Sequence, residues 1–111
     1  MTRHPSEYEA REIIVGAARE VLEGELGVLD GARVIAWYRF YIDPEQADED
    51  LLGIAGIESL TDHLLLGEDR FKWRSDILAA KEAEIAEAEA FFGPRMRESC
   101  IAVIERYAPA S

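Results

Sequence analysis

Most of the side chains that could do chemistry in this chain are carboxylates. Its 111 residues include 23 aspartates and glutamates against 12 lysines and arginines, which gives a formal net charge of −11. A surface this negative repels phosphates and anionic lipids, and it favours basic protein partners. We therefore expect no binding to nucleic acid or to a membrane. The acids either keep the protein soluble or recognise another protein.

The densest group of acids lies between residues 43 and 50. It consists of Asp43, Glu45, Asp48, Glu49 and Asp50, and no base interrupts it. Acids at this point also suit the positive N-terminal end of the helix that we expect to follow. We predict that these five acids form a surface that binds a partner protein with a basic surface.

A second group of charges shares helix faces with apolar residues. At about 100° per residue, Glu58 and Asp62 project on the same side as Leu51, and several bases interleave with the aromatic stripe of the next helix. Unpaired buried charges are costly, so we predict a partly buried polar network or cleft. Its members are Glu58, Asp62, Arg70, Arg74, Lys81 and Glu84. Alternatively, the long side chains lay their stems on the core and keep their charges in water.

The remaining residues do not favour catalysis or metal binding. The stretch from Ser59 to His63 holds hydroxyls, a carboxylate and an imidazole, but adjacent positions on a helix do not face one another. Neither histidine follows a glutamate by three positions, as di-iron bundles require, and one cysteine is too few for a typical zinc site. We predict no catalytic residue, no metal and no cofactor.

The single cysteine, Cys100, excludes an internal disulfide and lies on the apolar face of the last predicted helix. We expect a buried, unreactive thiol in a reducing compartment. The N-terminal residues lack the apolar run of a secretory signal, and no apolar stretch reaches the roughly 20 residues that span a bilayer. These features predict a cytoplasmic protein.

The elements that position these residues are predicted to be helices over 7–24, 30–42, 47–61, 69–92 and 94–107. Ser6 and Glu9 have the spacing of a capping box, and Gly24 is a plausible stop for the first helix. Asp30 is the expected N-cap of the second. The Gly93-Pro94 pair is expected to break or kink the chain between the last two helices.

The predicted fold is therefore one all-α domain over residues 1–111, a compact bundle of four to five helices. The helix over 30–42 is apolar on most sides, so we expect it at the centre. The long helix also carries a smooth strip of alanines that allows another helix to approach closely and makes a homodimer possible. The strip consists of Ala79, Ala83, Ala86 and Ala90.

Size, charge and the lack of catalytic motifs favour a small acidic protein-binding module. Immunity proteins, toxin-neutralising proteins and phage-encoded inhibitors are examples of this class. One alternative is a helical small-molecule-binding domain or enzyme with a polar cleft at Glu58, Asp62, Arg70 and Lys81. Another is a structural subunit that forms a homodimer.

Overall fold

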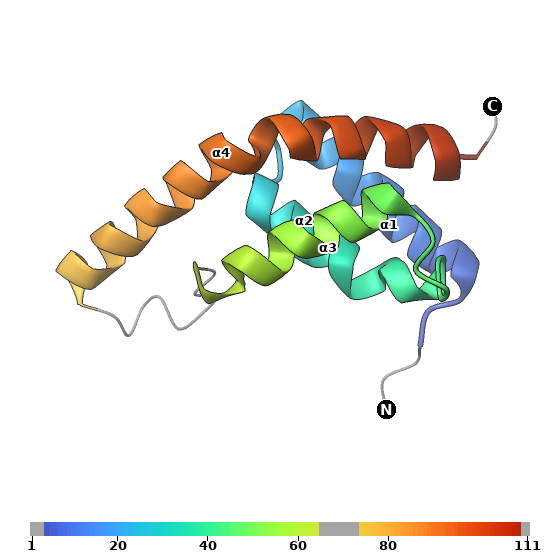
Figure 1. The fold of residues 1–111 in the computed structure, drawn as a ribbon, viewed down its shortest axis with the longest axis horizontal. Coiled ribbons are helices and arrows are strands. Elements are labelled where there is room, and N and C mark those ends of the chain that lie inside the picture. Colours follow the sequence, from blue (N-terminus) through green and yellow to red (C-terminus); the bar gives the residue numbers. More distant parts are fainter. Residues whose placement is uncertain (1–3, 65–73, 110–111) are drawn as a thin grey trace.

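The chain folds as an all-α protein, as predicted. The computed structural model describes residues 4–64 and 74–109, and within these ranges it contains helices and no strand. The elements are α1 (Glu7–Glu23), α2 (Val28–Tyr38), the short 3₁₀ helix η1 (Arg39–Tyr41), α3 (Glu49–Thr61), the short 3₁₀ helix η2 (Asp62–Leu64) and α4 (Ser75–Tyr107). Figure 1 shows α4 crossing the other three α-helices, with its first half extending beyond them.

Both ends of α1 agree with the sequence prediction to within one residue. The Ser6 hydroxyl accepts a hydrogen bond from the Glu9 N–H at 3.1 Å, and the Glu9 carboxylate accepts one from the Ser6 N–H at 3.3 Å. This reciprocal pair satisfies two backbone donors that the first turn would otherwise leave free. Gly24 ends the helix with a φ of 79°, a left-handed conformation that glycine adopts without strain.

The start of α2 differs from the prediction. The helix begins at Val28 rather than at Asp30, so the N-cap expected at Asp30 is wrong. The Val28 N–H donates to a carboxylate oxygen of Glu89 in α4 at 3.0 Å. Gly27 makes room for this contact, since a Cβ there would lie only 2.9 Å from the same oxygen. A carboxylate from a distant helix thus replaces the local cap, which the neighbouring residues could not reveal.

The central position predicted for the second helix is confirmed, because α2 contacts α1, α3 and α4. Its inner side is fully buried at Ile35, and α1 passes so close that a Cβ on Gly31 would collide with Val21. Its outer side is not covered, however. Trp37 is 71% exposed and Phe40 in η1 is 47% exposed, so the expectation of burial on most sides is wrong here.

The two helices predicted over 69–92 and 94–107 are a single helix, α4, within the described residues. Pro94 lies inside it, and the helix bends instead of ending (Figure 1). Proline removes one helical hydrogen bond and costs about 3 kcal/mol in a helix interior. Burial of Met96, Cys100 and Val103 after the proline favours continuation, because these side chains are fully enclosed only while the helix lies on the core.

Candidate partner-binding site

The acidic stretch over 43–50 meets the end of α4 and forms a hollow there. The hollow has a volume of about 420 Å³, and we refer to it as the acidic hollow. It is lined by Asp43, Ala47, Asp48, Glu49, Asp50, Arg106 and Tyr107. Four of the five acids predicted to bind a partner therefore lie around one concavity. Glu45 is exposed on the preceding turn.

Asp43 shapes the loop that carries these acids. Its carboxylate accepts hydrogen bonds from the backbone N–H groups of Ala47 at 3.1 Å and Asp48 at 2.9 Å. Gln46, which lies between Asp43 and Ala47, has a φ of 55°, so the loop turns back sharply at this point. An aspartate that bonds backbone donors a few residues onward is a common way to fix such a turn. Asp43 is thus engaged within the chain.

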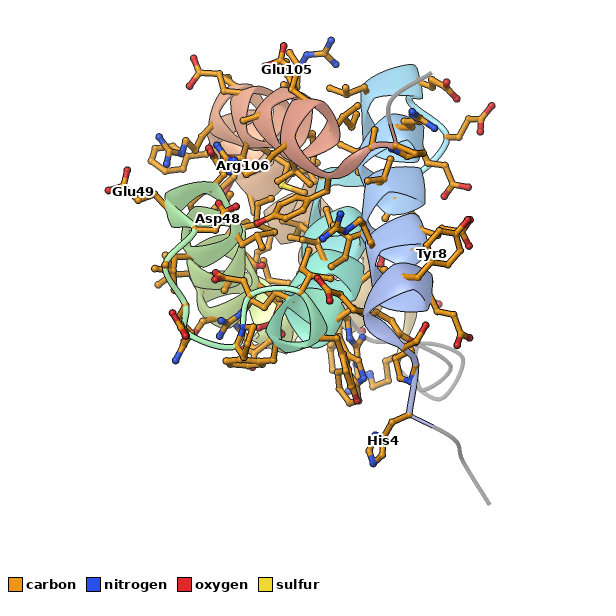
Figure 2. The ribbon with its side chains drawn as sticks, turned by 90° about the vertical axis from the view of Figure 1, so that its right-hand side faces the viewer. His4, Tyr8, Asp48, Glu49, Glu105 and Arg106 are labelled. Carbon is orange, nitrogen blue, oxygen red and sulfur yellow. The ribbon has the colours of Figure 1, made fainter. Side chains whose placement is uncertain are left out.

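The Asp48 carboxylate accepts hydrogen bonds from both helices that border the hollow, α3 and α4. It is the N-cap of α3, and its carboxylate accepts hydrogen bonds from the N–H groups of Asp50 at 2.9 Å and Leu51 at 3.1 Å. From α4, Arg106 donates to it at 2.6 Å and the Tyr107 hydroxyl at 2.5 Å. Its side chain is only 5% exposed. Figure 2 shows Asp48 and Arg106 pointing toward one another from the two helices.

These contacts shift the proton equilibria of both partners. Burial would raise the pKa of Asp48, but the hydrogen bonds from Tyr107, the Leu51 N–H and Arg106 outweigh it and lower that pKa. Burial, followed by the bond to the Asp48 carboxylate, raises the pKa of Tyr107 to about 12. The same carboxylate also raises the pKa of Arg106. The site therefore holds a carboxylate, a neutral phenol and a guanidinium over the ordinary pH range.

The remaining acids are more accessible. Asp50 forms a longer ion pair with Arg106 at 3.4 Å, and its side chain is about one quarter exposed, at 26%. Glu45 and Glu49 are exposed, and neither forms an ion pair with any residue in the described part of the chain. Figure 2 shows Glu49 directed away from the body of the protein. The predicted surface thus divides into bound inner acids and outer acids that face solvent.

Sequence reasoning missed Arg106 and Tyr107. They lie 58 and 59 positions from Asp48, and only the packing of α4 against α3 brings them to it. Arg11 of α1 adds a third element, with its guanidinium 5.6 Å from the centre of the Tyr107 ring. No local pattern signals such a contact. The one available hint was the position of Asp48 before a helix, where an acid suits the N-terminus.

The described residues of the predicted polar network are more widely separated than the acids around the acidic hollow. Arg74, the N-cap residue of α4, pairs with Asp76 at 3.4 Å, and Lys81 pairs with Glu84 at 3.9 Å within the first half of that helix. Asp62 is exposed in η2, and Glu58 lines a different hollow, between α2 and α3. Arg70 lies outside the described residues. Among the described members, no ion pair joins α3 or η2 to α4.

Further features bear on the class of protein. Cys100 is buried, as predicted, and burial raises the pKa of its thiol to about 11. In the described ranges, no three or more His, Cys, Asp or Glu residues are arranged to hold a metal ion. No helix there has an apolar stretch long enough to cross a membrane.

No known protein family, curated protein or solved structure matches the chain.

Proposed function

We propose that this protein is a small acidic protein-binding module that recognises a basic partner through the acidic hollow. It would act as immunity proteins, toxin-neutralising proteins and phage-encoded inhibitors do, by covering a basic surface on its target. The lone, buried Cys100 is consistent with such a role in the cytoplasm. The proposal keeps the acidic surface predicted from the sequence, with its inner and outer acids given separate roles.

The observation that carries the proposal is the negative charge of a concave surface. Four carboxylates and one guanidinium line the acidic hollow. Arg106, which pairs with Asp48 and Asp50, neutralises only part of this charge, because it brings one positive charge to four carboxylates. A lysine or arginine that enters the hollow would therefore meet an excess of negative charge on a backbone that the Asp43 and Asp48 hydrogen bonds hold in place.

The outer acids and the rest of the chain would act at longer range. Glu45 and Glu49 project beside the hollow, so their charges add to its field without first having to break internal ion pairs. The formal net charge of −11 extends that field over the whole molecule. Association with a basic protein is then fast and weakens as salt screens the field.

The test is capture of binding proteins, at low and high salt, from the cells in which the chain occurs. Three forms are compared: the unchanged chain, the double variant Glu45→Lys/Glu49→Lys, and a control, Glu20→Lys/Glu23→Lys. The control changes the net charge equally, but it does so at the far end of α1, where both residues are exposed. Arg11, the α1 residue that contacts Tyr107, is separated from Glu20 and Glu23 by about 14 to 18 Å along the helix axis, which exceeds the Debye length of about 8 Å at physiological salt.

We expect a basic protein that the unchanged chain and the control retain at low salt. The double variant should lose at least about tenfold in affinity for it, as measured by calorimetry. The proposal fails if no basic partner is recovered. It also fails if the control weakens binding as much as the double variant does, since net charge alone would then be responsible.

A further inference from the structure

The solvent-facing side of α3 is unusual for so highly charged a chain. Between the two ends of this helix the exposed residues are Leu52, Gly56, Ser59 and Leu60, and none of them is charged. Leu60 is 66% exposed and Leu52 is 40% exposed. A helix that is apolar on both its inner and its outer side normally lies between two partners. Within the described residues, the helical neighbours of α3 are α2, α4 and η2, and Leu52 and Leu60 stay exposed beside them.

The same surface continues onto α2 through a hollow of about 500 Å³. The hollow is lined by Arg33, Ala36, Trp37, Arg39, Phe40, Ala55, Glu58 and Ser59. Ser59 belongs both to this lining and to the exposed side of α3, so the two areas are continuous. We call the hollow, together with Leu52, Gly56 and Leu60, the α2–α3 face. Exposed tryptophan and arginine, as found here, are the residue types that dominate protein interfaces.

Packing within the described part of the chain does not require a glycine at position 56. A Cβ on Gly31 would strike Val21, and one on Gly53 would lie 3.2 Å from Arg95, whereas one on Gly56, like one on Gly16 or Gly93, would meet nothing within 4 Å. Glycine inside a helix costs about 1 kcal/mol relative to alanine. In this fold, therefore, the cost at Gly56 is not offset by internal packing. A second helix crossing α3 at this point would benefit from the missing side chain.

The α2–α3 face is also complementary to itself. A projecting indole, Trp37, stands beside a hollow on the same surface. Arg33 and Glu58 line that hollow, and neither forms an ion pair with any residue that the structure describes. About a suitably placed twofold axis, each Trp37 would meet the other copy's hollow and each Arg33 would meet the other copy's Glu58.

From these features we infer that the α2–α3 face binds a second copy of this chain, with Gly56 near the point where the two α3 helices cross. A basic partner is a poorer occupant, because two arginines, Arg33 and Arg39, line this face against one carboxylate, that of Glu58. Another copy of the chain is itself acidic, and it supplies Glu58. The α2–α3 face shares no lining residue with the acidic hollow, so the dimer does not depend on the proposed function.

The first test measures association directly. Sedimentation equilibrium at concentrations up to about 1 mM should show a reversible dimer of the unchanged chain. Trp37→Ala should weaken the dimer at least about thirtyfold, as expected for a residue at the centre of an interface. Phe91→Ala is the matched control, since Phe91 is 77% exposed on α4 and outside the face, and it should leave the dimer unchanged.

The second test uses the glycines. Gly56→Gln should fold normally, because its side chain enters open space, but it should prevent the close crossing and weaken the dimer at least about tenfold. Gly16→Gln on α1 is the control, since a Cβ on Gly16 also meets nothing within 4 Å. Circular dichroism of both variants verifies that the helices are retained.

The third test locates the interface. In separate variants, Ser59→Cys and Ala86→Cys place an exposed thiol on α3 or on the alanine strip of α4, while Cys100 stays buried and does not compete. A short bifunctional thiol reagent should join two copies through residue 59 and not through residue 86. A chain that is monomeric at every concentration overturns the inference. So does a dimer that cross-links at residue 86, or one that Trp37→Ala and Gly56→Gln leave intact.

Discussion

The acidic hollow and the hollow of the α2–α3 face have similar volumes, about 420 and 500 Å³, yet they are built in opposite ways. In the first, Arg106 and Tyr107 of α4 contact Asp48, and Arg106 also pairs with Asp50, so the inner acids are engaged within the chain. In the second, aromatic residues from an almost continuous apolar run face solvent. Residue type alone predicts the reverse, with charge outside and aromatic rings inside.

The difference shows that contacts between distant elements decide which groups are available to a partner. Asp48 has four hydrogen-bond donors and is nearly inaccessible, although the sequence around it suggests a solvated acid. Trp37 projects outward because the side of α2 that carries it is turned away from α1 and α4. A substitution at Asp48 should therefore mainly lower stability, whereas a substitution at Trp37 should mainly weaken binding.

The largest effect is expected at Asp48. Asp48→Ala removes a helix cap and leaves Arg106 and Tyr107 without their acceptor, so we expect unfolding to become easier by about 3 kcal/mol. Glu45→Ala, in the same acidic stretch, should change stability by less than about 0.5 kcal/mol, because its side chain is exposed. Urea unfolding followed by circular dichroism measures both. Equal losses would show that the inner and outer acids do not differ.

A smaller effect is expected at Tyr107, and it depends on pH. The pKa of Tyr107 is raised to about 12, so its contribution to stability is complete below the ordinary tyrosine pKa of about 10 and is lost as pH rises through 12. The pKa of Asp48 is lowered, so its contribution is present above about 4 and is lost as pH falls below that value.

Tyr107→Phe should cost about 1 kcal/mol near neutral pH, because the hydroxyl is only partly shielded from water. The variant should also lose less stability than the unchanged chain between pH 10 and 12, the interval that the two tyrosine pKa values define. Urea unfolding at several pH values tests this. An unchanged alkaline slope in the variant would mean that the phenol does not hold the site together.

Much of the fold could be predicted because its signals are local. The capping box at Ser6 and Glu9, the stop at Gly24 and the apolar spacing of α1 all lie within one helix. The predicted division into helices over 69–92 and 94–107 was wrong for a physical reason. Proline disfavours a helix locally, but burial of the residues after Pro94 outweighs that preference, and burial depends on the whole bundle.

The candidate site could be predicted only in part. Its acids are visible in the sequence, and four of the five line one hollow. Their partners are not visible, because Arg106 and Tyr107 reach the site only after α4 has packed beside α3. The same limit applies to the exposed aromatic residues, since helical spacing gives relative directions around α2 but not which side another helix covers.

The smallest effect on stability is expected at Trp37, and it tests the other half of the comparison. Loss of a buried tryptophan typically costs 3 kcal/mol or more, but Trp37 is 71% exposed. Trp37→Ala should therefore cost less than about 0.5 kcal/mol in dilute solution, where the chain is monomeric. Ile35→Ala, on the fully buried side of the same helix, should cost about 3 kcal/mol. Thermal unfolding of both variants at low concentration distinguishes the two sides of α2. A large loss at Trp37 would show that its ring supports the fold and is not available to a second copy.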